Sequence, residues 1–430
     1  MKDQLIQLIY QANPWLKNSS IAISNHDYVP RLQTSKLLLP EWDKLWLILV
    51  GPRQAGKTTL ALHLAQELIL QQRFNSLLYL NCDLIDIRNW LTTPLFIQEA
   101  IDEFHLEKPI ILIDEVQRLE NPGLLLKACA DLKLNIKMIA TGSSQLEMKS
   151  KVQEYLTGRH LEVLVLPLSY QEINQIDEKQ QLIYGCYPAV VKSSEKTLLL
   201  RQIYNDYINK DIIEILKVSK ADVMQNLITL IAHSSGQLVN YQQLATDCQV
   251  ASATIQNYLS ILENTYVLAR ISPFVGNKRK EITSNPIFYF IDNGFRNQSL
   301  HNLSQPLETR FDIGLLVQSA VFQELLKFKI QHFYDFAIKF WRTQSGAEVD
   351  FVLCHADSVI PIEAKFRHMQ AATISKSFRS FIDAYQPKHG FFITKDFNKK
   401  IMINQCEVHF IAFSRLLRLF DKLEEIFQNK

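Results

Sequence analysis

The sequence predicts an α/β fold that begins with a parallel sheet and ends with a second α/β segment. Apolar runs of strand length alternate with helical stretches from residue 45 to residue 166, a mostly helical region follows, and an α/β pattern returns after Gly314. The 430 residues also leave room for two to four domains, since roughly 150 residues make one. We assign residues 1–40 to an N-terminal arm, 41–168 to a first α/β core and 169–220 to a helical lid. Residues 221–310 form a helix-turn-helix region, and residues 311–430 form a second α/β segment.

Composition restricts the classes of partner. The formal net charge is only +2, so any nucleic-acid surface has to be a local patch. The chain does not begin with a signal layout, and its apolar runs are far shorter than the roughly 20 residues of a membrane helix. We therefore expect a cytoplasmic protein without a membrane partner. The cysteines are too widely spaced for a Cys-x-x-Cys pair and are expected to be buried and reduced: Cys82, Cys129, Cys186, Cys248, Cys354 and Cys406.

The first core is predicted to contain five strands. Each corresponds to a short apolar run, and the runs cover residues 45–50, 77–81, 110–113, 136–140 and 161–166. A helix is predicted from about Lys57 to Gln71, after the turn that follows the first strand. Strands that alternate with helices form parallel sheets covered on both faces, so we expect that arrangement here.

The turn after the first strand matches the pattern G-x-x-x-x-G-K-[ST] without a mismatch. Such a loop curls so that successive N–H groups point into one concavity and attract phosphates, together with the N-terminus of the following helix. Lys57 is expected to reach the β- and γ-phosphates, and the Thr58 hydroxyl to ligate Mg²⁺. The predicted ATP-binding residues are Gly51, Pro52, Arg53, Gln54, Ala55, Gly56, Lys57, Thr58 and Thr59.

The third strand ends in two carboxylates, Asp114 and Glu115. Asp114 is expected to hold the Mg²⁺ shell, and Glu115 to act as the base that polarises the attacking water. Thr141, Gly142, Ser143 and Ser144 follow the fourth strand, where Ser143 can orient that water, although a plain turn is the alternative. Arg159 precedes the fifth strand, and either touches a γ-phosphate as an arginine finger or lies on the surface as a solvated side chain.

Taken together, these motifs resemble a known family. Residues 51–59, Ile113-Asp-Glu-Val-Gln117, Thr141–Ser144, Thr157-Gly-Arg159 and Leu166–Glu172 occur in the order found in prokaryotic AAA+-type ATPases with a C-terminal domain of unknown function. Gly185–Pro188 is similar to a further stretch of that family, and the likeness extends from about residue 40 to 412. It implies ATP binding and hydrolysis, a winged-helix segment and a nuclease-like C-terminal fold. AAA+ proteins commonly form rings, which makes a homo-oligomer an option beside a monomer.

Residues 240–263 have a helix-turn-helix layout. Ile255, Tyr258, Leu259 and Leu262 fall on one helical face, which leaves Thr254, Gln256 and Asn257 to point outward, where polar side chains can contact bases. Residues 267–271 and 287–291 are the expected wing strands, and Lys278, Arg279 and Lys280 between them can lie on the phosphates of double-stranded DNA. The alternative is a wing that binds protein, because the recognition helix lacks lysine and arginine.

The last segment presents a second set of charged residues. Asp350 lies on one predicted strand. Glu363 and Lys365 lie on the next strand, where side chains two positions apart point to the same face. Asp350 and Glu363 can hold Mg²⁺, with Lys365 polarising a water or phosphate, an arrangement that resembles the PD-(D/E)xK nucleases. In the resembled family, glutamate is often found at the position of Gln318, and Glu324, one or two turns away, is a potential substitute. An inactive nuclease-like fold used for binding is the alternative.

Three functions remain open from sequence: an ATP-driven, DNA-associated machine, an ATP-gated Mg²⁺-dependent nuclease, and a nucleotide switch that binds other proteins.

Overall fold

Five parallel strands form the sheet of the first compact unit, which comprises Met1–Pro167 and Asn264–Tyr266. The computed structural model describes residues 3–18, 20–23, 28–132, 134–143, 158–215, 218–275, 284–356 and 358–428. The strands are β1 (Trp46–Val50), β2 (Ser76–Asn81), β3 (Pro109–Asp114), β4 (Lys137–Gly142) and β5 (His160–Leu164). Their order across the sheet is β2-β3-β4-β1-β5, so β4 separates the two strands that precede the predicted nucleotide motifs.

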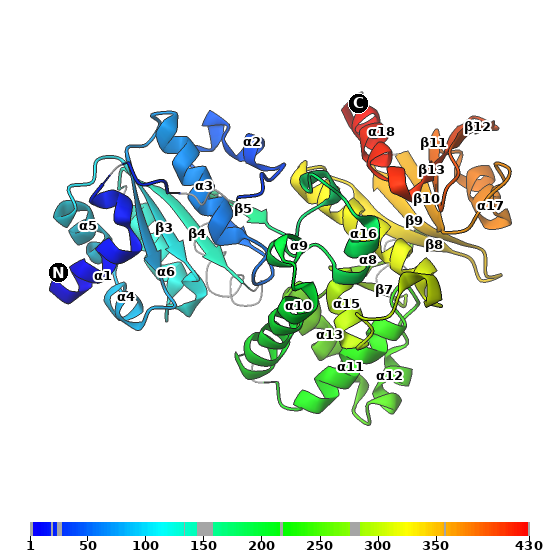
Figure 1. Ribbon diagram of the computed structural model, residues 1–430, viewed down its shortest axis with the longest axis horizontal. Coiled ribbons are helices and arrows are strands. Elements are labelled where there is room, and N and C mark those ends of the chain that lie inside the picture. The colour runs from blue at the N-terminus through cyan, green and yellow to red at the C-terminus, as the bar shows by residue number, and fades with distance from the viewer. Residues whose placement is uncertain are drawn as a thin grey trace. The chain divides into compact units, whose positions relative to one another are not determined.

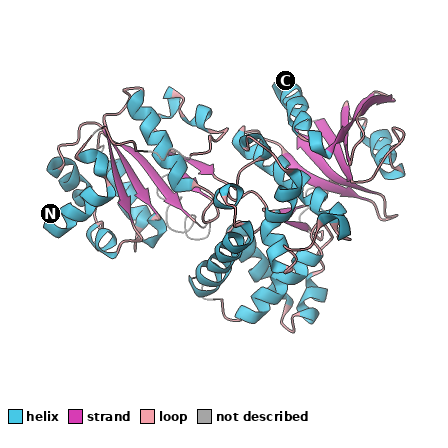
Figure 2. Ribbon diagram, viewed as in Figure 1, coloured by secondary structure: helices cyan, strands magenta, loops and turns pink. Residues whose placement is uncertain are grey.

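Helices lie on both sides of this sheet (Figure 2). They are α1 (Asp3–Ala12), α2 (Thr34–Leu37), α3 (Lys57–Leu70), α4 (Ile85–Trp90), α5 (Pro94–Glu103) and α6 (Pro122–Asp131). Short 3₁₀ turns occupy Pro14–Leu16, Pro40–Trp42 and Val116–Arg118. Alternate strand residues such as Leu47 and Leu49 pack with Leu60 and Leu64 of α3 in one buried cluster. The parallel α/β prediction is therefore confirmed, and the predicted strand limits differ from the observed ones by up to two residues.

The N-terminal arm is part of the first unit. The amide of Asn13 donates to the carbonyl of Tyr79 at 2.9 Å, and its oxygen accepts from the Tyr79 amide, so the arm is bonded to β2. Trp15 donates its indole N–H to the carbonyl of Leu77 at 2.9 Å. These bonds satisfy backbone groups on the outer edge of β2, which a bare edge strand would leave open.

The second unit comprises Leu168–Glu263 and Val267–Lys430, and its first half is helical (Figure 1). Its helices there are α8 (Glu178–Tyr184), α9 (Pro188–Lys192), α10 (Lys196–Asn205), a π-helix (Asp206–Ile215), α11 (Ala221–His233), α12 (Tyr241–Asp247), α13 (Ser252–Asn264) and α15 (Asn293–Ser299). A 3₁₀ turn covers Tyr170–Glu172, and β6 (Leu268–Ile271) pairs antiparallel with β7 (Ile287–Phe290). One apolar cluster joins α9 through α15, because residues as distant as Val190, Ile255 and Phe295 share it.

A six-stranded sheet forms the other half of the second unit. Its order is β12-β13-β11-β10-β9-β8, and only the β10–β11 and β11–β13 pairs are parallel. The strands are β8 (Ala337–Arg342), β9 (Glu348–His355), β10 (Ser358–Lys365), β11 (His389–Thr394), β12 (Lys399–Ile403) and β13 (Cys406–Ala412). The helices are α16 (Ile313–Gln331), α17 (Lys376–Tyr385) and α18 (Leu417–Gln428), with 3₁₀ turns at Leu307–Thr309 and Phe413–Arg415. Phe378 and Phe381 of α17 cover one face of this sheet.

Five of the six cysteines are buried, as predicted, and Cys354 is the exception. All six are free thiols, and Cys354 is partly exposed. Within the described ranges, the structure has no helix long and apolar enough to cross a membrane.

Candidate functional site

The phosphate loop leaves the sheet at the carboxyl end of the fully buried strand β1. Gly51 has φ +146°, and a Cβ atom at this position would lie 2.1 Å from the carbonyl oxygen of Val165. Glycine is therefore required here, both by the backbone conformation and by the close approach of the chain that follows β5. Gln54 and Gly56 also have positive φ, at 60° and 96°, so the loop curls tightly before α3 begins at Lys57.

Lys57 is 5% exposed and lies within the loop that precedes it. Its Nζ donates to the carbonyl oxygens of Gly51 at 3.0 Å and Pro52 at 2.9 Å. The ammonium group is thus held at the mouth of the loop by two weak dipoles. A polyphosphate would provide formal negative charge in their place, and such charge-assisted bonds are roughly twice as strong as neutral ones.

Asp114 is the centre of a buried hydrogen-bond cluster at the carboxyl end of β3, where it is 6% exposed. Its Oδ1 accepts from the hydroxyl of Thr58 at 2.8 Å and from the hydroxyl of Thr141. Its Oδ2 accepts from the phenol of Tyr79 at 2.9 Å. Burial and the charge of Asp114 raise the pKa of Tyr79, so its phenol remains a donor. Thr58 and Asp114, predicted together from the sequence, are therefore in direct contact.

Glu115 directly follows β3 in a left-handed conformation, with φ 54°. One carboxylate oxygen accepts from the amide of Gln117, and that amide also donates to the hydroxyl of Ser143 at 2.9 Å. The amide N–H of Glu115 donates to Thr141 at 3.1 Å. Burial raises the pKa of Glu115, and the nearby Lys57 opposes this shift. A carboxylate with a raised pKa and a fixed direction is a stronger base than a solvated carboxylate, which suits it to accept a proton.

Strand order brings Ser143 and Thr141 to this site. Because β4 lies between β3 and β1, the residues at its carboxyl end fall between the two nucleotide motifs. Gln117 joins Ser143 to Glu115, Thr141 donates to Asp114, and Tyr79 reaches Asp114 from β2. Sequence reasoning missed Tyr79 and Gln117 as site residues. Gln117 is visible as the last residue of Ile113–Gln117, whereas Tyr79 is identifiable only from the pairing of β2 with β3.

The N-terminal arm also contacts the phosphate loop. Arg31 is 6% exposed, and its guanidinium donates to the carbonyl oxygen of Ala55 in the loop and to that of Leu166 at 3.0 Å. Arg31 thereby ties the loop to the chain after β5. An isolated arginine in an arm gives no sequence signal for this role.

Arg159 lies at the amino end of strand β5, whereas the phosphate loop follows the carboxyl end of β1. It precedes β5, whose His160 pairs with Trp46 at the start of β1, whereas the loop follows Val50 at the end of β1. Four strand residues separate those two levels, which is about 13 Å. The guanidinium pairs with Asp131 at 2.6 Å, and both side chains are half exposed. The structure does not bring Arg159 to the loop of its own chain, so an arginine finger remains a prediction for a neighbouring subunit.

The residues of the first unit fit a magnesium nucleotide. Thr58 and Asp114 supply the hard oxygen ligands that Mg²⁺ prefers, and they already lie 2.8 Å apart. The loop supplies a curled backbone at the start of a 14-residue helix, which is a site for anions. When bound, the ion neutralises phosphate charge.

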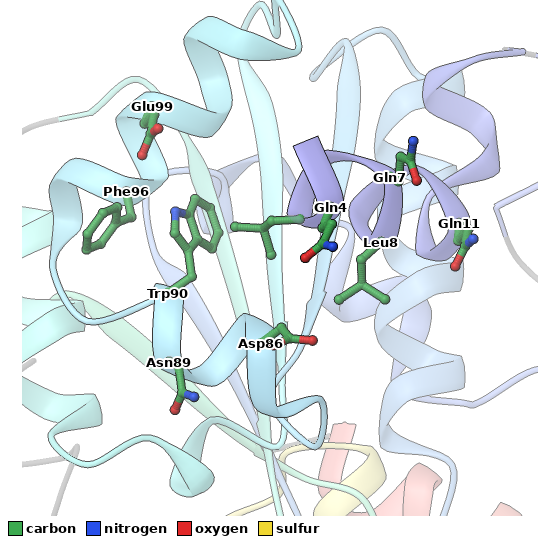
Figure 3. A pocket seen from close by; sticks show the side chains of 10 residues that line it. Gln4, Gln7, Leu8, Gln11, Asp86, Asn89, Trp90, Phe96 and Glu99 are labelled. Atoms are coloured by element: carbon green, nitrogen blue, oxygen red, sulfur yellow. The ribbon is translucent and has the colours of Figure 1, made fainter. Parts of the chain in front are cut away.

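A separate cavity of about 910 Å³ in the first unit lies between α1, α4 and α5 (Figure 3). Trp90 and Phe96 lie on one side of it, and Gln4 and Leu8 of α1 lie on the other. The charged groups among its described lining residues are the carboxylates Asp86 and Glu99, which repel phosphate. This cavity therefore does not suit a nucleoside triphosphate. None of the site residues predicted from the sequence lines it.

In the second unit, the predicted carboxylates come together. Ile362 of β10 pairs with Phe351 of β9, so the next step of the antiparallel register sets Glu363 opposite Asp350. The Lys365 ammonium lies 3.2 Å from Glu363. Burial, followed by the charge of Glu363, raises the pKa of Asp350 to about 7, although Lys365 opposes this shift. Burial raises the pKa of Glu363 as well.

The helix α16, which precedes this sheet, places Gln318 rather than Glu324 beside Asp350. Gln318 of α16 donates to Asp350 at 3.2 Å and to the Tyr289 hydroxyl at 3.1 Å, so its carboxamide lies at the carboxylate pair. Glu324 is 2% exposed, and its oxygens accept from Lys327 at 2.8 Å and from the Tyr170 amide at 2.7 Å. Glu324 is therefore committed elsewhere and does not replace the missing carboxylate.

Two helices, α12 and α13, occupy the residues of the predicted helix-turn-helix. Ile255, Tyr258, Leu259 and Leu262 are buried, whereas Gln256 and Asn257 are exposed and Thr254 is partly exposed, as the periodicity predicts. The antiparallel β6–β7 pair follows at the position of the expected wing strands. Lys278, Arg279 and Lys280 lie outside the described residues, as does Ser144.

Three segments of the chain match known families. Residues 43–174 match the family described as AAA domain. Residues 176–306 and 313–411 each match a domain of unknown function, DUF8612 and DUF4143. The first part of the chain thus carries a P-loop ATPase domain of the AAA type, and its position agrees with the loop, the Asp114 cluster and the parallel sheet.

Related sequences share most of the chain at low identity. An uncharacterized protein of Haemophilus influenzae is 24% identical over 343 residues, which is 74% of this chain and 82% of that protein. The uncharacterized protein Rv2008c of Mycobacterium tuberculosis is 24% identical over 381 residues, 85% of this chain and 79% of that protein. The uncharacterized protein MJ1637 of Methanocaldococcus jannaschii is 25% identical over 333 residues, 67% of each chain.

Two solved structures have a low overall similarity to this chain. AMPPCP-bound DnaA from Aquifex aeolicus is 14% identical, covers 54% of this chain and 85% of its own, and has a TM-score of 0.27. PCH-2 from C. elegans is 20% identical, covers 36% of this chain and 41% of its own, and has a TM-score of 0.24. At these scores, neither likeness bears on function.

Proposed function

We propose that this protein binds and hydrolyses ATP at the phosphate loop and that its second unit uses the ATPase cycle at DNA. The observation that carries the ATPase proposal is the contact of Thr58 with Asp114, beside a Glu115 carboxylate held by Gln117. It joins a Mg²⁺ ligand pair to a positioned base. Lys57 would bind the phosphates, and Ser143, through Gln117, would keep Glu115 aimed at the attacking water.

DNA association is proposed from the helix-turn-helix and the hairpin that follows it. Exposed Gln256 and Asn257 on α13 are of the residue type that reads base edges. The sequence between β6 and β7 adds Lys278, Arg279 and Lys280, a source of phosphate contacts. This combination of exposed amides and a cationic cluster favours a DNA partner, because bases and phosphates offer groups that both can contact.

ATP turnover measured with and without double-stranded DNA, at two salt concentrations, tests this proposal. We expect DNA to stimulate hydrolysis and the stimulation to fade with salt. Three phosphate contacts correspond to a slope of about −2.7 in log affinity against log salt. Turnover that ignores DNA at both salt concentrations would favour a switch that binds protein, and no turnover at all would remove the ATPase itself.

A second candidate activity is Mg²⁺-dependent DNA cleavage gated by ATP. It is favoured by the meeting of Asp350, Glu363 and Lys365 on adjacent strands, with Lys365 3.2 Å from Glu363. Opposing it, Gln318 occupies the place of a third carboxylate and lowers the negative charge available to a metal.

Nicking of supercoiled DNA in Mg²⁺ or Mn²⁺, with and without ATP, tests this activity. Cleavage should disappear in Lys365→Ala, because the ammonium is the group positioned to polarise a water or phosphate. Lys376→Ala is the matched control, since Lys376 is exposed at the start of α17. If neither metal supports cleavage by the unmodified protein, or if Lys365→Ala cuts equally well, the nuclease proposal is wrong and the fold serves binding.

A further inference from the structure

Two histidines and a glutamate meet on the other face of the six-stranded sheet. His389 of β11 pairs with Glu407 of β13, and Phe391 pairs with His409, so all four side chains share one face. Glu363 pairs with Phe392 and hence lies on the opposite face, with α17. The cluster is therefore distinct from the Asp350–Glu363 carboxylates.

The three side chains converge closely. One ligand atom from each of His389, Glu407 and His409 lies within 4.8 Å of the others, and this is the one such group of three among the residues the structure describes. A tetrahedral metal with bonds of about 2.0–2.2 Å needs ligand atoms roughly 3.3 Å apart. Small side-chain rotations of the partly exposed groups suffice to reach that spacing.

Neighbouring groups already orient these ligands. Glu407 Oε2 is held by the Lys400 ammonium at 2.6 Å, which leaves Oε1 directed at His409 Nε2, also at 2.6 Å. The His409 ring stacks on Phe391, with centroids 5.3 Å apart and planes 21° apart. Bound carboxylates and imidazoles in metal sites are commonly fixed by such outer contacts.

We propose that His389, Glu407 and His409 bind a divalent transition-metal ion, with Zn²⁺ as the best fit. Two imidazoles and one carboxylate are a ligand set typical of Zn²⁺ sites that keep a fourth position for water. His389 also lines a cavity of about 680 Å³, so solvent reaches the site. The bound ion would join β13 to β11 through side chains in addition to their backbone hydrogen bonds. The proposal is independent of ATP hydrolysis and of nuclease activity.

The test uses the full chain without a histidine tag, stripped of metal and titrated with Co²⁺ and then Zn²⁺. We expect one Co²⁺ per chain with the visible absorption of a tetrahedral site, displaced by Zn²⁺, and a higher melting temperature with Zn²⁺. His409→Ala and His389→Ala should each weaken binding by more than 100-fold, since removing outer contacts alone costs about 10- to 100-fold. His368→Ala is the control, because His368 is an exposed histidine in the loop after β10, where it pairs with Asp396 in the loop after β11.

A conservative variant separates a loss of metal binding from a loss of the fold. Glu407→Gln retains the shape of the side chain but weakens a ligand, so it should lower affinity in a protein that melts normally without metal. Absent Co²⁺ absorption, equal affinity in His409→Ala, or a spectrum with cysteine-to-metal charge transfer would overturn the proposal.

Discussion

Glutamine in place of Glu115 is expected to reduce ATP turnover by ~10²–10⁴-fold while ATP remains bound, the range in which a general base usually contributes. Glu115 is positioned by its left-handed backbone and by the Gln117 amide. Burial raises the pKa of Glu115, which makes its carboxylate a stronger base than a solvated one. Glutamine keeps the size of the side chain and loses the basic oxygen, so binding and chemistry should separate. Single-turnover hydrolysis and ATP retention, measured on one preparation, check both halves.

Glu120→Gln provides the matched control. Glu120 follows the same strand but is exposed, and its replacement should leave turnover unchanged. Full hydrolysis by Glu115→Gln would show that Glu115 is not the base. Ser143 would then be the next residue to replace. Loss of ATP binding together with turnover would instead assign Glu115 to the structure of the site.

Alanine in place of Lys57 should abolish stable nucleotide binding. The ammonium is buried within the loop and would exchange the carbonyls of Gly51 and Pro52 for phosphate oxygens. Removal of one partner from a buried, hydrogen-bonded charge pair costs about 2–5 kcal/mol, which corresponds to a loss of roughly 30- to 5,000-fold in affinity. Retention of labelled ATP in the presence of Mg²⁺ measures this effect directly.

Lys44→Ala, at an exposed position just before β1, controls for the loss of a positive charge. It should retain ATP as the unmodified protein does. The melting temperature of Lys57→Ala without nucleotide, measured on the same preparation, separates a loss of nucleotide binding from a loss of the fold. Undiminished ATP retention in Lys57→Ala would contradict the placement of the nucleotide at this loop.

Contiguous motifs were the most predictable part of the site. Residues 51–58 specify a curled loop through their own backbone, and Asp114 and Glu115 follow a strand whose apolar run is plain in the sequence. The prediction that Thr58 and Asp114 act together is supported by their hydrogen bond. The periodicity of residues 252–264 likewise predicted which side of α13 is buried. In each case, local spacing carries the information.

Contacts between distant segments were not predictable in this way. Tyr79 reaches Asp114 because β2 pairs with β3, and Arg31 reaches the phosphate loop from an arm that shows no motif. The exclusion of Arg159 from its own loop follows from the direction of β5. Glu324 appeared in sequence to be a substitute ligand, but Lys327 and Tyr170 hold it.

The sequence by itself determined the parallel α/β core, the phosphate loop and its two following carboxylates, since these depend on residues adjacent along the chain. Only the tertiary structure decided that β4 lies between β3 and β1, which places Thr141 and Ser143 beside the motifs. It also decided that His389, Glu407 and His409 share a face. The physical reason is that strand order and register are set by packing of the whole sheet, and a shift of one residue would turn each of these side chains to the other face.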